Sequence, residues 1–293
     1  MPDATTGASI PEVTHHHTLL NDTDLHYVSA GSDGTPVLLV HGFPETWWTF
    51  HKLIPLLAAD HRVIAVDLPG FGDSGTAPED STSATTAETL RRLINELDLG
   101  PVHLTGQDIS GVTTFRLAAV HPELVRSFAA IETGLPGFGV EMLADVIHGG
   151  AWHIGVLAAP GIPEMLLAGR EREFLADYAY PAMCATNGAI TDHDVDEFTR
   201  TFARPDGFRG ASSLYRSMLQ EGNEIRELAG HSRLQMPVLA IGARSGDFPH
   251  HTMTQVADHV STATLDGVGH YAAMEAPEAL ARALLGFYRS LDA

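Results

Sequence analysis

Short apolar runs and longer stretches with helical spacing alternate along the chain. Runs typical of buried strands occupy residues 36–40, 62–66, 101–105, 127–131 and 237–241. An opening hairpin is predicted at residues 16–20 and 24–28, and a last strand at 263–265. Helical spacing is present in residues 86–97, 112–120 and 277–291. This alternation predicts an α/β protein whose mostly parallel, eight-stranded sheet is flanked by helices.

The pattern changes between residues 135 and 232, where helical stretches occur without a convincing apolar strand. Two independent domains are disfavoured, because neither flanking part alone would complete a sheet. We therefore expect a discontinuous core domain, residues 1–134 and 233–293. A helical cap, residues 135–232, is inserted after the sixth strand.

The composition restricts the class of partner. The chain has 293 residues, with 17 basic and 37 acidic side chains and a formal charge of −20. Such a charge repels nucleic acid and anionic membranes, so a small neutral substrate is expected. The sequence allows a homodimer without fixing the oligomeric state.

Targeting and metal signals are weak. The first fifteen residues lack the basic start and apolar core of a secretory signal, and no apolar run approaches the roughly 20 residues of a membrane span. A cytoplasmic protein is expected. The single cysteine, Cys184, excludes an intrachain disulfide and a CxxC-type metal site. Residues 15–17, three histidines, are interpreted as the start of a strand, so no metal or cofactor is predicted.

Residues 106–111, Gly-Gln-Asp-Ile-Ser-Gly, carry the strongest chemical signal. A small-x-acid-x-small-small sequence between strand and helix is how α/β hydrolases build a nucleophile elbow. Asp108 stands where esterases carry serine, which excludes a serine esterase. A carboxylate can attack an sp³ carbon and form an ester, which narrows the chemistry to opening epoxides or displacing halides.

The ester must then be hydrolysed, which requires a base and an acid that orients it. His270 follows the last predicted strand, where this fold places its base. Two acids compete. Glu132 ends a strand in apolar sequence, where a carboxylate needs a partner, whereas Asp247 lies in a polar loop. Glu132 is favoured, with Asp247 as the alternative.

An oxyanion site is predicted beside the elbow. Residues 41–44, His-Gly-Phe-Pro, follow a buried strand and should aim a backbone N–H at the nucleophile. The predicted donors are the amides of Phe43 and Ile109.

These motifs resemble the epoxide hydrolase and dehalogenase branch of the α/β hydrolases, and the likeness covers nearly the whole chain. The matching segments are residues 41–46, 67–74, 106–111 and 267–270. Within that branch the cap is similar to those of Cif-like epoxide hydrolases and fluoroacetate dehalogenases, at residues 152–153, 168–175 and 214–216. The resemblance implies an α/β-hydrolase fold with an inserted cap, and it places the triad acid at Glu132.

The same resemblance separates epoxides from halides. It maps a ring-opening donor pair onto His153 and Tyr215, although Tyr178, Tyr180 and Tyr271 compete with Tyr215. The carboxylate-binding arginines of fluoroacetate dehalogenases correspond to Ile109 and Val112, and their halide-side tryptophan to Ile154. Epoxide hydrolysis to a vicinal diol is therefore expected. A haloalkane or haloacid dehalogenase and a non-catalytic ligand-binding protein are the alternatives.

The predicted pocket is apolar or aromatic, which favours an apolar or aromatic epoxide. Its predicted lining comprises Trp47, Phe138, Met142, Trp152 and Ile154. Two departures from the usual elbow are Gln107, where histidine is common, and Ser110, where glycine is usual. The larger Ser110 side chain is expected to tighten the turn.

Overall fold

The computed structural model describes residues 7–292 except 21, 80 and 232. These residues form one eight-stranded sheet in the order β1-β2-β4-β3-β5-β6-β7-β8. Pairing is antiparallel for β1 with β2 and for β2 with β4, and parallel elsewhere. The strand bounds are β1 Thr14–Leu20, β2 Thr23–Ala30, β3 Val37–Val40, β4 Val63–Val66, β5 Val102–Gln107, β6 Val125–Ile131, β7 Val238–Gly242 and β8 Val260–Thr264. The predicted fold class, including the opening hairpin, is confirmed.

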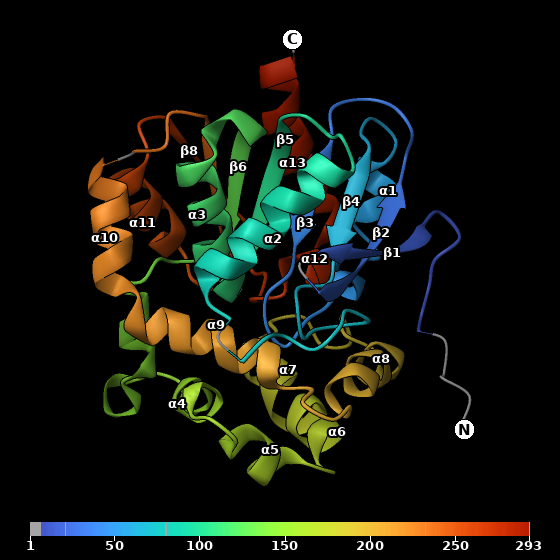
Figure 1. Ribbon diagram of the computed structural model, residues 1–293, viewed down its shortest axis with the longest axis vertical. Coiled ribbons are helices and arrows are strands. Elements are labelled where there is room, and N and C mark those ends of the chain that lie inside the picture. The colour runs from blue at the N-terminus through green and yellow to red at the C-terminus, as the bar shows by residue number, and fades with distance from the viewer. Residues whose placement is uncertain (1–6, 21, 80, 232, 293) are drawn as a thin grey trace.

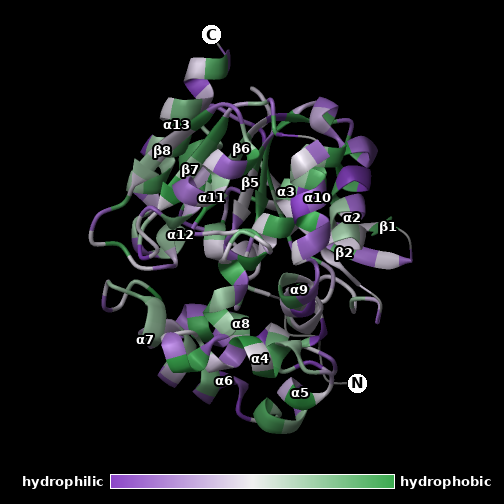
Figure 2. Ribbon diagram, turned by 90° about the vertical axis from the view of Figure 1, so that its left-hand side faces the viewer, coloured by the Kyte–Doolittle hydropathy of each residue, from purple (hydrophilic) through white to green (hydrophobic). Residues whose placement is uncertain are grey.

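Helices cover both faces of the sheet (Figure 1). On one face lie α2 (Ser83–Glu96) and α3 (Gly111–Val120), and on the other α1 (Ile54–Leu57) and α13 (Pro277–Asp292). The remaining helices that flank the sheet are α10 Gly222–His231, α11 Phe248–Val256 and α12 Ala272–Glu275. Every residue of β3, β4, β5 and β7 is buried, as expected for strands covered on both faces. Figure 2 shows this apolar interior in green.

Most predicted boundaries differ slightly from the structure, and the largest differences are at the starts of α2 and β8. Helix α2 begins at Ser83, before the predicted residue 86, because the Thr82 hydroxyl accepts a hydrogen bond from the Thr85 amide and caps the helix. Strand β8 begins at Val260, before the predicted residue 263. This edge strand is mostly exposed and polar, so its sequence gives a weak apolar signal.

Between β6 and β7 the described residues form helices without a strand. This helical segment lies across the carboxyl ends of the parallel strands (Figure 1). Its elements include α4 Trp152–Ala158, α5 Ile162–Leu167, α6 Glu171–Glu173, the π-helical turn η6 Phe174–Ala179, α7 Tyr180–Met183, α8 Asp192–Phe202 and α9 Arg209–Gln220. Residues 1–6, 21, 80, 232 and 293 of the predicted domain ranges lie outside the described residues.

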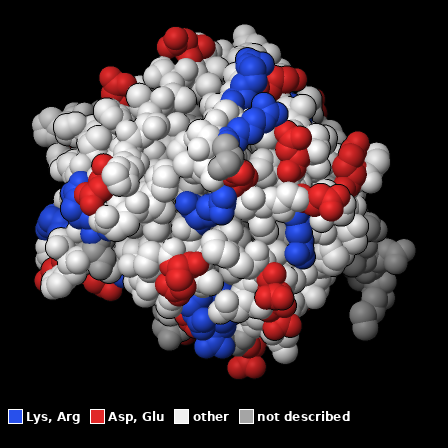
Figure 3. Space-filling model, turned by 90° about the horizontal axis from the view of Figure 1, so that it is seen from above, with Lys and Arg blue, Asp and Glu red and all other residues white. Residues whose placement is uncertain are grey.

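The surface at the opposite end of the molecule carries both charge signs. Figure 3 shows acidic and basic side chains interspersed there among neutral ones. The formal charge of −20 therefore does not gather into a single acidic field on this face. None of the helices in the described part of the chain combines the length and hydropathy of a transmembrane span.

Candidate active site

The turn after β5 holds Asp108 in a strained conformation above the sheet. Its φ is +51°, in the left-handed region that non-glycine residues rarely occupy. The Thr133 hydroxyl donates to the Asp108 carbonyl at 2.6 Å, and the Ser110 hydroxyl donates to the Gln107 carbonyl at 2.7 Å. These bonds hold the turn, and Ser110 closes it as the sequence predicted.

Glycines allow close approach around this turn. A Cβ added to Gly111 would lie 1.8 Å from Thr133 Oγ1, and one added to Gly106 would lie 2.1 Å from Thr114 Oγ1. A side chain at either position would displace the elbow. The small residues at 106 and 111 are therefore required by packing.

His270 lies between two carboxylates. Its Nε2 is 3.4 Å from Asp108 Oδ1, and its Nδ1 is 3.0 Å from Glu132 Oε2. The loop that carries it is anchored on the helical segment, because the His270 amide donates to the Met183 carbonyl at 2.9 Å. The Nε2 atom of His270 is buried and makes no hydrogen bond among the described residues. We therefore describe its contact with Asp108 as an ion pair.

Glu132 directly follows β6 and has a φ of +50°. Its Oε1 accepts hydrogen bonds from the amides of Ala243 (2.6 Å) and Ser245 (3.0 Å). Burial acts to raise its pKa, but His270, Ser245 and Ala243 outweigh burial and lower it, so the carboxylate stays ionised. Asp247, the alternative acid, is exposed next to the start of α11. The hydrogen bond of His270 Nδ1 is accepted by Glu132.

The two carboxylates control the charge of His270. Burial opposes protonation of the imidazole, but the proximity of Asp108 and Glu132 prevails and raises its pKa to about 10. Burial also acts to raise the pKa of Asp108, and His270 together with the Phe43 and Ile109 amides lowers it. The Phe43 amide donates to Asp108 Oδ2 at 3.0 Å. At neutral pH the site is an ionised carboxylate beside an imidazolium.

His153 and Tyr215 lie on the helical segment and face the elbow across a cavity. Their rings meet edge to face, with centroids 6.0 Å apart. Burial lowers the pKa of His153 and raises the pKa of Tyr215 well above its usual value. Near neutral pH the first is therefore a neutral imidazole and the second a protonated phenol.

The cavity has a volume of about 510 Å³. Its lining brings together the candidate residues Phe43, Asp108, Ile109, Glu132, His153, Ile154, Tyr215 and His270. Most of the remaining wall is apolar, with contributions from Val112, Val140, Leu143, Phe174, Met183, Met218 and Phe248.

Four of the five predicted pocket residues do not line this cavity, and only Ile154 does. Trp47 is fully buried in the core, against Trp48, because its amide is tied to the Asp67 carboxylate. Phe138 is half-buried against the core. Met142 and Trp152 are 62% and 40% exposed. An apolar residue near a predicted site thus faced the core or solvent more often than the cavity.

Sequence reasoning missed a buried acid beneath the elbow. Glu45 accepts hydrogen bonds from the Gly42 amide (2.9 Å), the Thr49 hydroxyl (2.6 Å) and the Gln107 side-chain amide (2.8 Å). Burial outweighs these bonds and raises its pKa to about 7. Two features of the sequence could have indicated this acid. Glu45 lies within the matching segment 41–46, and Gln107 is unusual at its position; the structure shows that the two side chains are hydrogen-bonded to each other.

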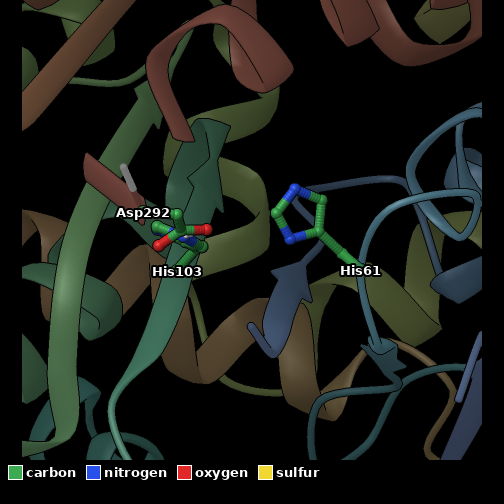
Figure 4. Close-up of side chains that lie close together, drawn as sticks. All are labelled: His61, His103 and Asp292. Atoms are coloured by element: carbon green, nitrogen blue, oxygen red, sulfur yellow. Dashed lines mark hydrogen bonds and ion pairs between the residues drawn. The ribbon is translucent and has the colours of Figure 1, made fainter. Parts of the chain in front are cut away.

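Among the residues that the structure describes, two groups of side chains have the composition of a metal site. Figure 4 shows the first, His61, His103 and Asp292. Asp292 is already paired with Arg126 at 2.6 Å, and His103 Nδ1 bonds to the Ser127 hydroxyl at 2.7 Å. A nearby guanidinium disfavours a metal cation, so we interpret this group as a hydrogen-bonded cluster whose histidines are buried and whose Asp292 is exposed.

The second group is His26, Asp67 and Asp73. Its carboxylates are engaged as well, Asp67 with His26 at 2.7 Å and Asp73 with Arg200 at 2.8 Å. Because these carboxylates already have partners, we interpret this group too as a hydrogen-bonded cluster and not as a metal site.

Comparison with known proteins supports the assignment of the fold and its branch. Residues 35–277 match the family described as alpha/beta hydrolase fold. A soluble epoxide hydrolase of Corynebacterium sp. (strain C12) is 28% identical over 96% of this chain and 99% of its own length. The crystal structure of wild-type Cfl2 from Burkholderia cenocepacia is 32% identical, with a TM-score of 0.86 over 99% of this chain and 98% of that one.

A haloalkane dehalogenase of Psychrobacter cryohalolentis is 36% identical over 140 residues, which are 44% of this chain and 46% of that enzyme. The resemblance predicted from the motifs is thereby confirmed. The chain belongs to the alpha/beta hydrolase fold family, and it is a hydrolase enzyme.

Proposed function

We propose that the protein hydrolyses a small, neutral epoxide to a vicinal diol through an ester on Asp108. The observation that carries the proposal is the carboxylate of Asp108 at the elbow position. Its Oδ1 lies 3.4 Å from Nε2 of His270, whose Nδ1 is hydrogen-bonded to Glu132. Its full-length similarity to a soluble epoxide hydrolase supports the same chemistry.

In the first step Asp108 attacks one epoxide carbon in line with the C–O bond. The new C–O bond forms on Asp108, and the electron pair of the broken bond moves to the epoxide oxygen. That oxygen needs a proton donor, because an alkoxide is a poor leaving group. His153 and Tyr215, both uncharged near neutral pH, line the cavity and supply N–H and O–H donors.

In the second step His270 activates water. Forming the ester removes the negative charge of Asp108, one of the two carboxylates that hold the imidazole protonated. The pKa of His270 then falls, and its proton is released by way of solvent to replace the one that His153 or Tyr215 gave to the epoxide oxygen. The neutral ring can then accept a proton from water. Water adds to the ester carbonyl, the Phe43 and Ile109 amides stabilise the oxyanion, and diol departs as the Asp108 carboxylate re-forms.

The domain arrangement follows from this reaction. We assign residues 1–134 and 233–293 to a core that supplies nucleophile, base and acid. Residues 135–232 form a cap that supplies the ring-opening donors His153 and Tyr215, which lie on α4 and α9. The largely apolar lining favours an apolar or aromatic epoxide.

A dehalogenase is the second candidate, because one relative is a haloalkane dehalogenase. Halide departure is helped by a cradle of N–H donors, and haloacids require a cationic anchor. The corresponding positions, Ile109, Val112 and Ile154, are apolar and line the cavity. The site therefore favours the epoxide.

The deciding experiment is intact-mass analysis of His270→Gln mixed with styrene oxide. We expect a covalent adduct equal in mass to one epoxide, mapped by peptide analysis to Asp108. The matched control is the double variant Asp108→Ala/His270→Gln, which should remain unmodified. Diol formation by the wild type without any adduct in His270→Gln would refute the ester mechanism. Halide release from haloalkanes in place of diol formation would establish the dehalogenase, and binding without turnover a ligand-binding protein.

A further inference from the structure

Tyr178 contacts His153, one of the two proposed ring-opening donors, at one of its ring nitrogens. Its hydroxyl lies 3.4 Å from His153 Nδ1, and both residues line the cavity. Tyr178 belongs to the π-helical turn η6, in which the Tyr180 amide bonds to the Leu175 carbonyl five residues earlier. Such turns insert a residue into a helix and re-aim its side chains.

Aromatic neighbours fix the position of this phenol. The ring of Tyr178 packs against Trp152, with centroids 5.0 Å apart, and against Phe174 at 5.8 Å. His153 is held between Tyr178 and Tyr215, with ring centroids 6.1 Å and 6.0 Å away. The hydroxyl is therefore presented to Nδ1 by packing and does not depend on a mobile side chain.

A neutral imidazole has one N–H, so the partner of one nitrogen decides the role of the other. If Nδ1 carried the proton, Nε2 would be a lone pair and would repel the oxygen of an epoxide. If Nδ1 accepts a hydrogen bond, Nε2 carries the proton and becomes the donor. Burial raises the pKa of Tyr178, so this hydroxyl keeps its proton and can donate.

We propose that Tyr178 is a positioning residue that acts through His153. Its O–H donates to Nδ1, which fixes the ring orientation and keeps the imidazole proton on Nε2, toward the epoxide oxygen. The inference rests on the proposed function, because a proton held on Nε2 helps catalysis only if the substrate is an epoxide. The tautomer itself is a property of the resting enzyme and can be measured without substrate.

The first test is the two-bond ¹H–¹⁵N spectrum of wild-type protein labelled at histidine, with the His153 signals assigned from their loss in His153→Asn. We expect the Nε2–H tautomer, with Nδ1 as a hydrogen-bond acceptor. A protonated Nδ1 would overturn the proposal whatever the activity of the enzyme. In Tyr178→Phe the Nδ1 signal should lose the shift caused by hydrogen bonding.

The second test measures ester formation in the His270→Gln background by the time course of the styrene oxide adduct. Tyr178→Phe should slow this step by about tenfold, the worth of one hydrogen bond. The rate at which the ester decays in the enzyme that keeps His270 should be unchanged. The matched control is Tyr288→Phe, which removes a buried phenol hydroxyl bonded to Thr105, away from the cavity.

The two measurements distinguish the possible failures. An unchanged adduct rate and unchanged His153 spectrum in Tyr178→Phe would refute the role of Tyr178. A slower rate with an unchanged spectrum would show direct contact with substrate and refute positioning. If no epoxide forms an adduct, the proposed function fails, while the wild-type spectrum still decides the tautomer.

Discussion

Glu132 Oε2 lies 3.0 Å from His270 Nδ1, although the two residues are 138 positions apart in the chain. Glu132 follows β6 and His270 follows β8, and both strands belong to the parallel part of one sheet. Strand β7 lies between them in the sheet. The carboxyl ends of parallel strands lie at the same edge, so the segments that follow β6 and β8 can meet there across the end of β7. The left-handed backbone of Glu132 turns its carboxylate towards the imidazole and towards the 243–245 loop.

This contact predicts unequal effects of removing the two candidate acids. Glu132→Gln should lower kcat by about 100-fold or more, because the imidazolium loses its buried counter-charge and its orientation. The hydrolytic step suffers most, so ester should accumulate during steady-state turnover with styrene oxide. Asp247→Asn, the matched control at an exposed site, should keep wild-type kcat. The reverse order of effects would transfer the role to Asp247.

The charge of Asp108 should be visible in the pH dependence of stability. His270 has a folded pKa of about 10 against an ordinary value of 6.5, so between these values the folded state binds more protons than the unfolded chain. Rising pH in this window therefore favours unfolding, by up to about 1.4 kcal/mol per pH unit. Asp108→Asn removes one carboxylate and lowers this pKa.

Urea unfolding of both proteins from about pH 7 to about pH 9 measures the effect. The wild type should lose stability steadily across the range, and Asp108→Asn should lose less. An NMR titration of His270 provides the site-specific check. Parallel stability curves, with the same His270 pKa in both proteins, would contradict the coupling between these residues.

Most of the sheet could be predicted because its strands are short, continuously apolar runs. Asp108 and His270 could be placed because each lies at a fixed point after a strand. Glu45 could not be assigned a partner, because its bond to Gln107 depends on how two separate loops meet beneath the elbow. Motifs describe one segment at a time, whereas this contact needs two.

The pocket was predicted poorly for a different physical reason. Trp47 and Trp152 have similar side chains, yet one is 1% exposed in the core and the other 40% exposed on the helical segment. Hydrophobicity favours burial of both and does not specify which surface buries them. The position of Tyr178 depends on the π-helical turn, which shifts the register of the residues that face the cavity.

Tyr215→Phe should slow ester formation. The variant keeps the aromatic ring but removes the O–H donor that stabilises the negative charge developing on the epoxide oxygen. We expect about a 100-fold loss in single-turnover adduct formation in the His270→Gln background. The loss should shrink for epoxides with electron-withdrawing substituents, whose oxygen leaves more readily. Equal losses across such a series would indicate a packing role for this phenol.

Elbow geometry predicts that Gly111→Ala is severely damaging. Its Cβ would lie 1.8 Å from Thr133 Oγ1, the atom that donates to the Asp108 carbonyl, so turn and nucleophile must both shift. Overpacking of this kind destabilises a protein by about 1–3 kcal/mol. The matched control is Gly286→Ala in α13, where an added Cβ meets nothing within 4 Å and should stabilise by roughly 0.5–1 kcal/mol.

A second variant separates crowding from backbone effects at this glycine. In Gly111→Ala/Thr133→Gly the three Thr133 side-chain atoms that crowd the added Cβ (Oγ1 at 1.8 Å, Cβ at 2.7 Å and Cγ2 at 2.8 Å) are all absent. Relative to Thr133→Gly alone, stability in urea should therefore recover most of the loss. Activity should stay low, because the Asp108 carbonyl has then lost its hydrogen-bond donor and the strained turn can relax. Stability that stays low in the double variant would show that residue 111 needs glycine for its backbone. Helical φ and ψ at this position (−55° and −38°) argue against that outcome, since alanine adopts them readily.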